Sequence, residues 1–155
     1  MSDIKEWAYA AYLFPVREIN GQKQIAFLVY DNDWHGTIGG RIDGNETPRD
    51  AMCREALEEL GEWAKSIIDN AIEIPEKYIR KVPDSCVERR CARNEEHTFF
   101  VSKVPADIEI KLNQEDLCGC HIEWVGIKEL KNDPTQKFRD TRENVRAMIS
   151  FFENL

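Results

Sequence analysis

One stretch of this sequence, residues 40–61, constrains the fold more than any other, because it fixes where a helix begins and what one face of that helix carries. It reads GRIDGNETPRDAMCREALEELG. Thr47 suits the N-cap of a helix, Pro48 the first helical position, and Asp50 completes a capping box with Thr47. We therefore predict a helix that starts at Pro48, behind a glycine-rich turn.

Three glutamates of this predicted helix fall on one face. Glu55, Glu58 and Glu59 are spaced i, i+3 and i+4, so their carboxylates should converge. Crowded like charges repel one another, and a hard cation such as Mg²⁺ relieves that repulsion while it keeps positions for phosphate oxygens. A solvated helix face is the alternative, but the spacing favours a metal site and therefore an enzyme.

The same stretch resembles the Nudix box. That motif has a glycine, five residues, a glutamate, seven residues, an Arg-Glu pair, then an apolar residue, a Glu-Glu pair and a glycine. Here the matching residues are Gly40, Glu46, Arg54-Glu55, Ala56, Glu58-Glu59 and Gly61. The chain departs from the motif at Glu62, where an apolar residue is usual, and we expect Trp63 to supply the missing contact at the helix end.

The flanking segments predict strands and a final helix. Four runs rich in apolar, β-branched and aromatic residues read as strands, and Asn20-Gly21 is a hairpin signal between the first two. The runs span residues 7–16, 24–30, 97–104 and 121–127, a closing amphipathic helix spans 141–154, and within 62–96 we expect a short helix over 63–71 and a strand over 72–82. The resemblance implies the α/β Nudix fold, a mixed β-sheet sandwiched between α-helices, in a single domain over residues 1–155.

Composition narrows the possible partners. The 155 residues carry a net charge of −8, which argues against a nonspecific nucleic-acid binder, because such proteins use clustered lysine and arginine. We find neither a long apolar run nor a signal segment, so we expect a cytoplasmic protein that does not enter a membrane. A small phosphorylated molecule, such as a nucleotide derivative, is the expected substrate.

The resemblance also implies a chemistry. A Nudix hydrolase cleaves the phosphoanhydride of a nucleoside diphosphate linked to another group, with Mg²⁺ or Mn²⁺ neutralising the phosphate oxygens and activating water. Glu55, Glu58, Glu59 and the Gly39 carbonyl would hold the metal, and Glu55 or Glu58 could accept the proton of the attacking water. Glu115 is a candidate ligand or base outside the box, although a solvated loop carboxylate is the plainer interpretation.

Other residues of the box look architectural. The family resemblance implies a salt bridge between Glu46 and Arg54 that fixes the loop over the helix. Gly39 and Gly40 would let the backbone turn closely enough to aim a carbonyl at the metal, because glycine tolerates dihedral angles that other residues do not. A simple turn is the alternative for the two glycines.

The substrate-binding candidates are weaker. Trp34 and His35 precede the glycines and could stack on a base or sugar, or simply pack. Arg89 and Arg90 offer forked donors that suit phosphate oxygens, although neighbouring glutamates favour a solvated charged loop.

A zinc site built from the cysteines with His97 and His121 is an open alternative that their spacing does not favour. Cys86 and Cys91 are separated by four residues, and Cys118 and Cys120 by Gly119, which does not match common zinc motifs. Cys53 should pack as a small apolar side chain inside the predicted helix. We therefore expect reduced thiols.

Two further hypotheses stay open beside the enzyme. A module with the same fold could bind a nucleotide or a protein without turnover, although it would not need clustered carboxylates. Alternatively, the motif is a coincidence in an acidic structural protein. The family often forms homodimers, and the apolar Phe151-Phe152 end could serve as a contact.

Overall fold

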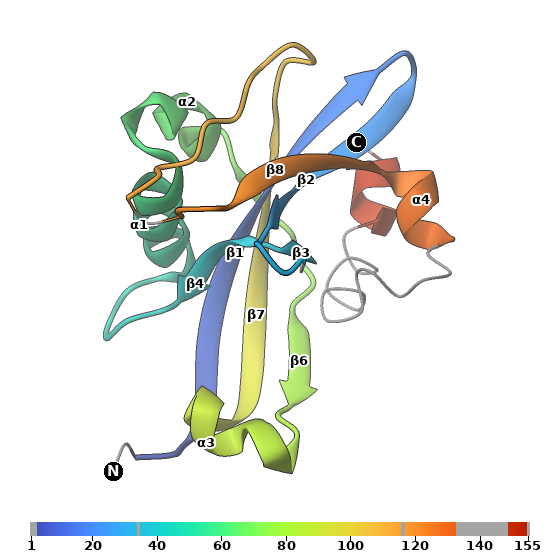
Figure 1. Cartoon of the computed structure of the whole chain (residues 1–155). Coiled ribbons are helices and arrows are strands. Elements are labelled where there is room, and N and C mark those ends of the chain that lie inside the picture. The colour runs from blue at the N-terminus through green and yellow to red at the C-terminus, as the bar shows by residue number, and fades with distance from the viewer. Residues whose placement is uncertain (1–2, 34, 116, 133–148, 155) are drawn as a thin grey trace.

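The computed structural model describes residues 3–33, 35–115, 117–132 and 149–154. Within those residues the chain forms an eight-stranded mixed sheet with the path β3-β2-β1-β7-β5, to which β4, β6 and β8 add as extra pairs. The strands are β1 (Lys5–Ile19), β2 (Gln22–Val29), β3 (His35–Gly36), β4 (Ile38–Arg41), β5 (Ile72–Glu73), β6 (Tyr78–Lys81), β7 (Ala92–Lys103) and β8 (His121–Gly126). Figure 1 shows the long strands β1 and β7 running down the middle of the molecule.

Strand β1 organises the sheet. It pairs in parallel with β7 along most of its length, from Lys5↔Ala92 to Val16↔Lys103. On its other edge it pairs antiparallel first with β4 and then, beyond Pro15, with β2. Strand β1 therefore fixes the register of both β7 and β4, the short strand that contains Gly39 and Gly40.

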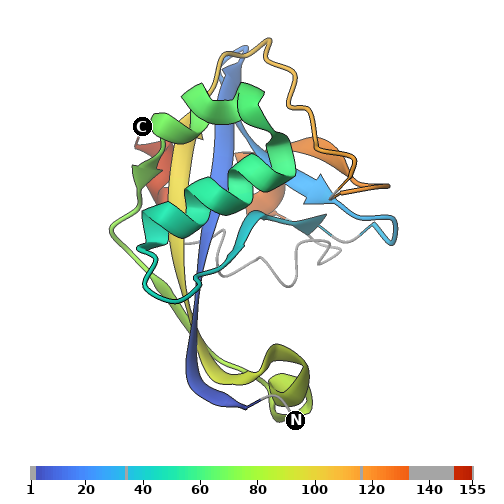
Figure 2. The ribbon, with the colours of Figure 1, turned by 90° about the vertical axis from the view of Figure 1, so that its left-hand side faces the viewer.

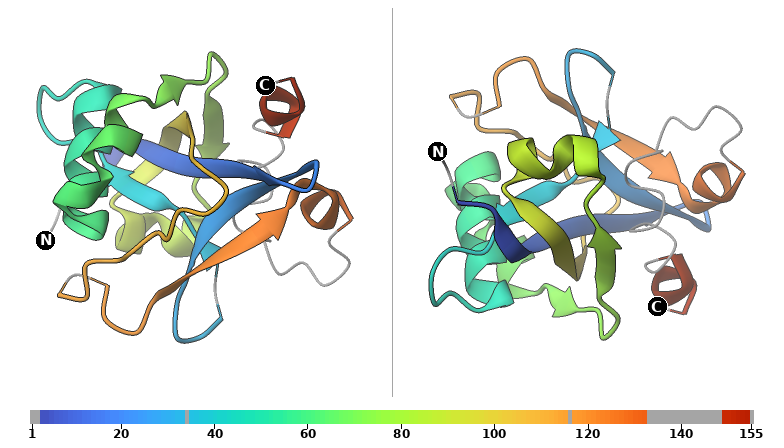
Figure 3. Two further views of the ribbon diagram at one scale, coloured as in Figure 1. Left: turned by 90° about the horizontal axis from the view of Figure 1, so that it is seen from above. Right: turned by 90° about the horizontal axis from the view of Figure 1, so that it is seen from below.

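Helices cover the two faces of this sheet. On one face lie α1 (Pro48–Leu60) and α2 (Lys65–Asp69), and on the other lie α4 (Ile127–Lys131) and the helical residues 149–153 (Figure 3). Seen from the side, α1 crosses in front of β1 and β7 (Figure 2). The short helix α3 (Val87–Arg90) sits apart, at the end where β1 and β7 begin.

Alternating side chains of β1 build two apolar clusters, one on each face. Ala11 and Leu13 pack with Met52, Ala56 and other residues of α1 and α2. Phe14 and Val16 point the opposite way and pack with a second group that includes Phe27, Phe99, Ile127 and Phe152. The predicted α/β architecture, a mixed sheet sandwiched between α-helices, is therefore confirmed.

Most of the predicted elements are present, with shifted bounds. The Asn20-Gly21 turn joins β1 to β2, and both residues have positive φ angles (52° and 77°), as a type I′ hairpin turn requires. The predicted helix over 63–71 is a 3₁₀ turn, Glu62–Ala64, followed by α2. Of the predicted helix over 141–154, residues 149–153 are helical, and the part that contains Val145 and Met148 lies outside the described residues.

Two local predictions were wrong. A single strand over 72–82 is instead two short strands, β5 and β6, with Pro75 between them, because proline has no N–H to donate to a ladder. The expected turn at Gly39 and Gly40 is strand β4, paired with Tyr12 and Ala11 of β1. No helix in the described part of the chain is both long and apolar enough to cross a bilayer.

Candidate active site

Helix α1 begins where its sequence predicts. The Thr47 side chain accepts a hydrogen bond from the Asp50 backbone N–H (3.1 Å), and the Asp50 carboxylate accepts one from the Thr47 N–H (3.1 Å). This capping box and Pro48 at the first position fix the start of the helix. The buried residues Ala51, Met52, Ala56 and Leu60 fasten one side of the helix to the sheet. The glutamates therefore lie on a helix whose orientation is set by packing.

Arg54 is the centre of the charged side of α1. Its guanidinium donates two hydrogen bonds to Glu46, from Nε to Oε2 (2.9 Å) and from Nη2 to Oε1 (3.0 Å). Nη2 also donates to the backbone carbonyl of Arg41 (3.1 Å). Its Nη1 also lies 3.1 Å from Oε1 of Glu55 and 3.7 Å from Oε1 of Glu58. The hydrogen bonds from Arg54 lower the pKa of Glu46, so this carboxylate stays ionised.

Glu59 is held from the sheet side. The backbone N–H of Gly39 in β4 donates to its Oε1 atom at 3.3 Å, and its Oε2 atom is buried. Gly39 has φ +136°, and a Cβ at this position would lie 2.2 Å from the carbonyl oxygen of Ala11. Only glycine fits here, so β4 can approach both β1 and the carboxylate of Glu59.

Gly40 leaves room for Glu55 in the same way. A Cβ at Gly40 would lie 2.7 Å from the Glu55 carboxyl carbon and 2.7 Å from its Oε1 atom. The carboxylate of Glu55 therefore rests directly against the backbone of β4. The two glycines bring strand and helix close enough to place oxygen atoms of Glu55 and Glu59 beside the same short strand.

These groups fit a divalent cation, although the side chains face other partners here. Carboxylate and carbonyl oxygens are the ligands that Mg²⁺ and Mn²⁺ prefer. Glu55 and Glu58 already flank one positively charged nitrogen, Nη1 of Arg54, and Gly40 provides the cradle in which Glu55 lies. Among the described residues no three His, Cys, Asp or Glu side chains form a ready-made cage, so binding would require the carboxylates to rotate.

Comparison with known proteins agrees with this geometry. The family model of the NUDIX domain matches residues 9–147 of the 155. The chain belongs to the Nudix family. This membership supports a hydrolase of pyrophosphate bonds.

Solved structures show the same fold at low sequence identity. An Ap4A hydrolase from C. elegans aligns with a TM-score of 0.61 at 14% identity and covers 94% of this chain and 98% of its own. The Nudix hydrolase RenU from M. smegmatis aligns with a TM-score of 0.60 at 15% identity, over 92% of this chain and 85% of its own. MERS1 of T. brucei, solved with RNA, aligns with a TM-score of 0.54 at 17% identity, over 88% of this chain and 47% of its own.

A loop packs against the C-terminal end of α1. Asn113 donates from its backbone N–H to the Glu59 carbonyl (2.7 Å) and from its side chain to the Glu58 carbonyl (3.1 Å). Glu115 is exposed two residues farther on, and its N–H donates to the Asn113 side chain (3.2 Å). The structure thus anchors the Glu115 loop to the helix that carries the box glutamates.

A cavity of about 450 Å³ that the sequence did not reveal is lined by Tyr30, Asp31, Asn32, Cys118 and Cys120. Burial and then the negative charge of Glu59 raise the pKa of Tyr30. Burial, followed by the negative charges of Asp31, Cys118 and Glu59, also raises the pKa of Cys120. Glu59 thus acts electrostatically on both side chains, and the sequence carried little signal for this cavity, since Tyr30 stands nine positions before Gly39.

The other substrate candidates fall in different places. Trp34 lies outside the described residues. His35 is buried, with Nδ1 3.1 Å from the Asp33 carbonyl and Nε2 3.3 Å from Glu123, and its ring packs edge-on against Phe27.

The two candidate arginines diverge, although they are adjacent in α3. Arg89 contacts the sulfur of Cys86 at 3.5 Å. Arg90 turns inward to Glu95 at 2.5 Å.

The five cysteines are free thiols. No group of three metal-binding side chains, zinc ligands included, assembles among the described residues. Cys53 is half-buried in α1, as its sequence position predicts, and burial raises its pKa. Trp63 remains partly exposed and donates to the Leu60 carbonyl at 2.6 Å, so it closes the end of α1 mainly through a hydrogen bond.

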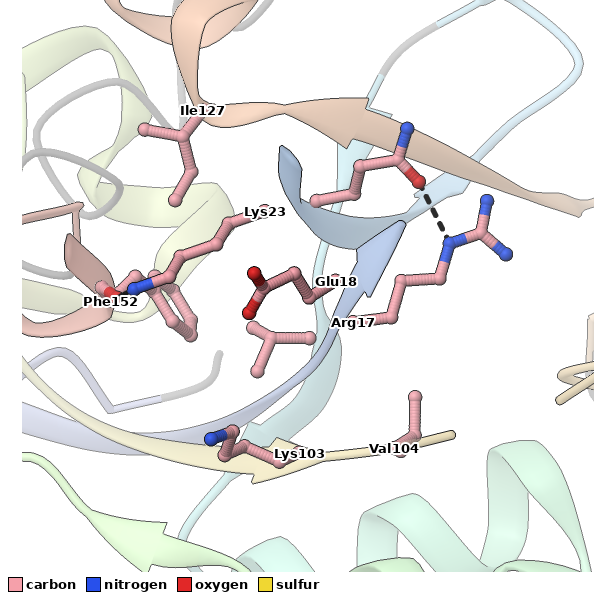
Figure 4. A pocket seen from close by; sticks show the side chains of 9 residues that line it. Arg17, Glu18, Lys23, Lys103, Val104, Ile127 and Phe152 are labelled. Carbon is pink, nitrogen blue, oxygen red and sulfur yellow. Dashed lines mark hydrogen bonds between the residues drawn. The ribbon is translucent and has the colours of Figure 1, made fainter. Parts of the chain in front are cut away.

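A second cavity, of about 170 Å³, lies at the β1–β2 hairpin, and none of the box glutamates lines it (Figure 4). Lys23 and Phe152 line it, and Arg17 donates to Gln24 at its rim (2.8 Å). Lys23 is already bonded to the carbonyls of Phe152 (2.8 Å) and Glu153 (3.2 Å), so it fastens the C-terminal helix to the hairpin. We interpret this cavity as a packing feature and not as a catalytic site.

Proposed function

We propose that this Nudix protein is a metal-dependent pyrophosphohydrolase that cleaves a nucleoside diphosphate linked to another group. The single observation that carries the proposal is the placement of Glu55 and Glu59 against the glycine strand β4, with Glu58 beside them. Mg²⁺ or Mn²⁺ held by these carboxylates and the Gly39 carbonyl would neutralise phosphate oxygens and lower the pKa of water. The Ap4A hydrolase and RenU neighbours support the fold of such an enzyme.

The surrounding residues position the carboxylates. Arg54 holds Glu55 from one side while the backbone at Gly40 supports it from the other. The N–H of Gly39 directs Glu59 toward β4. These contacts fix the helix and the strand from which the carboxylates rotate to the metal, so the scaffold itself needs no rearrangement during the reaction.

Glu58 is the best proton acceptor among the three. Half of its side chain (53%) is exposed, against 21% for Glu55, and its contact with Arg54 is long at 3.7 Å. It can therefore turn toward a water molecule at the surface. The proton of that water passes to the Glu58 carboxylate, the hydroxide attacks phosphorus, and the bridging oxygen leaves with one phosphoryl product.

The substrate we propose is a small nucleotide derivative, taken up beside Tyr30 and Asn32. The cavity there is next to the loop that carries Glu115, which places a possible further carboxylate at the same end of α1. The free thiols are consistent with a reducing compartment such as the cytoplasm. A homodimer remains part of the proposal through the partly buried Phe151.

A binding module without turnover is the second candidate. It is supported by MERS1, a protein of the same fold that was solved in complexes with RNA and with GDP. Against it, the three box glutamates and both glycines are retained in this chain.

The deciding experiment incubates the protein with nucleoside triphosphates, dinucleoside polyphosphates and nucleotide sugars, each with Mg²⁺, with Mn²⁺ or with EDTA. Products are separated by anion exchange, and ¹⁸O-labelled water shows which phosphorus is attacked. We expect a nucleoside monophosphate product that EDTA abolishes. Binding of a nucleotide without any product, measured as a rise in Tm, would establish the binding module instead.

A further inference from the structure

A buried carboxylate lies beneath three arginines on the sheet face opposite α1. Glu95 of β7 is 1% exposed and receives Arg80 of β6 through Nε (2.9 Å) and Nη2 (2.6 Å). Arg90 of α3 reaches its Oε2 atom at 2.5 Å, and Arg41 of β4 reaches the same atom at 3.4 Å. We call Arg41, Arg80, Arg90 and Glu95 the arginine cluster.

The arginine cluster has more positive than negative charge. Three guanidinium groups surround one carboxylate, and each arginine side chain keeps between 31% and 36% of its surface exposed. Burial alone would raise the pKa of Glu95, but interactions with His97, Arg90 and Arg80 outweigh it and hold the pKa well below its usual range. Glu95 is therefore ionised, and two positive charges remain uncompensated within the cluster.

Buried polar atoms beside the cluster also lack partners. His97 is 5% exposed, its Nε2 atom faces Glu95 across 4.0 Å, and its Nδ1 atom makes no hydrogen bond within the described part of the chain. The Nε atom of Arg90 is likewise buried without a described partner. Rings of Tyr12, Tyr78 and Phe99 pack around His97, with centroids 5.1, 5.7 and 6.3 Å away. Buried polar atoms without a partner are costly unless a ligand or a water molecule meets them.

One residue joins the cluster to the active site. The backbone carbonyl of Arg41 accepts a hydrogen bond from Arg54 of α1, while its side chain reaches Glu95. Arg41 follows Gly39 and Gly40 in β4, so along the strand the cluster begins about 7 Å from the N–H that holds Glu59. Within the described residues β4 pairs only with β1, so its outer edge lies between the two groups.

We propose that the arginine cluster is an anion site that binds a phosphate group of the substrate other than those joined by the cleaved bond. Guanidinium forks bind phosphate oxygens through paired, charge-assisted hydrogen bonds. Glu95 sets the geometry of the arginines and limits their charge. The statement about a substrate rests on the function proposed above, but anion binding itself is measurable without turnover.

The test measures the Kd of inorganic tripolyphosphate by calorimetry in EDTA, so that the metal site does not contribute. Glu95→Gln removes the negative charge and keeps a similar shape, so we expect tighter binding. Arg80→Gln and Arg41→Gln each remove a donor fork, and we expect binding weaker by about tenfold, which corresponds to one charge-assisted hydrogen bond.

Lys77→Gln is the matched control. Lys77 lies near β6 and pairs with Glu96 at 4.0 Å, so its loss removes one positive charge without touching the cluster. We expect its Kd to stay within about twofold of wild type. Circular dichroism establishes whether each variant is folded. If Glu95→Gln does not fold, the comparison of Arg41→Gln with Lys77→Gln tests the proposal, because the contact of Arg41 with Glu95 is the longest of the three.

The results separate this proposal from the enzymatic one. Unchanged tripolyphosphate binding in folded Arg41→Gln or Arg80→Gln overturns the anion site, as does an equal loss in Lys77→Gln. A protein that binds tripolyphosphate through the arginines but hydrolyses nothing in the substrate panel keeps the anion site and removes the enzyme. If the protein hydrolyses a substrate of the panel but does not bind tripolyphosphate, the enzyme is kept and the anion site is overturned.

Discussion

The carboxylate of Glu55 occupies the space in which a side chain at Gly40 would begin. A Cβ at residue 40 would lie 2.7 Å from the carboxyl carbon, well inside van der Waals contact. The absence of a side chain on one strand residue is therefore a condition for the position of a carboxylate on the facing helix.

Gly40→Ala should reduce activity more than stability. The added methyl group meets the end of a flexible side chain, so Glu55 can swing away at a cost below about 1 kcal/mol. We expect kcat/KM to fall by about tenfold or more, because a small displacement of a catalytic group is costly. Gly126→Ala is the control, since a Cβ there meets nothing within 4 Å. Equal activity of Gly40→Ala and wild type would refute the role of this contact.

Glu59→Gln should abolish most turnover while the fold persists. The substitution keeps the hydrogen bond from Gly39 possible but removes the charge, and we expect kcat to fall by about 10² or more. Mg²⁺ should also no longer raise Tm, because the stabilisation that a ligand provides follows its affinity. Glu62→Gln, an exposed glutamate just beyond the helix, should behave as wild type. Wild-type turnover in Glu59→Gln would show that our assignment of the metal site is wrong.

Arg54→Lys should separate position from charge. Lysine keeps the positive charge but cannot form the two parallel bonds to Glu46 while also reaching Glu55 and the Arg41 carbonyl. We expect a clear fall in kcat with a smaller change in unfolding free energy, since lysine keeps a positive charge beside these partly buried carboxylates. Steady-state kinetics and denaturant titration measure the two effects. A loss of stability as large as the loss of activity would mean that Arg54 is mainly structural.

Glu95 should give stability a defined dependence on pH. Its folded pKa is depressed, so its contribution is complete above the unfolded value near 4.5 and is lost as pH falls toward the folded pKa. Between pH 5 and 8 the difference in unfolding free energy between wild type and Glu95→Gln should be constant. Below pH 4.5 it should shrink by about 1.4 kcal/mol per pH unit. A difference that does not change between pH 7 and pH 3 contradicts the ion-paired state.

Local patterns predicted the helix of the site and its partners. The capping box and the Arg54–Glu46 pair lie within one short stretch of chain, so spacing alone brings those residues together. The fold class followed from the resemblance of that stretch to the Nudix box, with which the order of the predicted strands and helices agreed. These features depend on neighbours in sequence, and sequence patterns report such neighbours well.

Features that depend on pairing between distant strands were not predicted. The arginine cluster draws one residue each from β4, β6, α3 and β7, and the alternation of glutamate and arginine around residue 90 suggested a solvated loop. Only the register Arg80↔Glu95 between β6 and β7 places those side chains together. Similarly, nothing local showed that Gly39 and Gly40 form a strand, because their partner residues lie far back in β1.

Tyr12 of β1 pairs with Gly39 of β4 on one edge and with Phe99 of β7 on the other. The register of β1 therefore sets the position of the box glutamates, through β4, relative to the arginine cluster on β7. Lengthening the Asn20-Gly21 hairpin would leave that alignment intact. One extra residue inserted between Ala10 and Leu13 would shift the register of β4 against that of β7. The box glutamates beside β4 and the arginine cluster on β7 would then no longer be aligned for the same substrate.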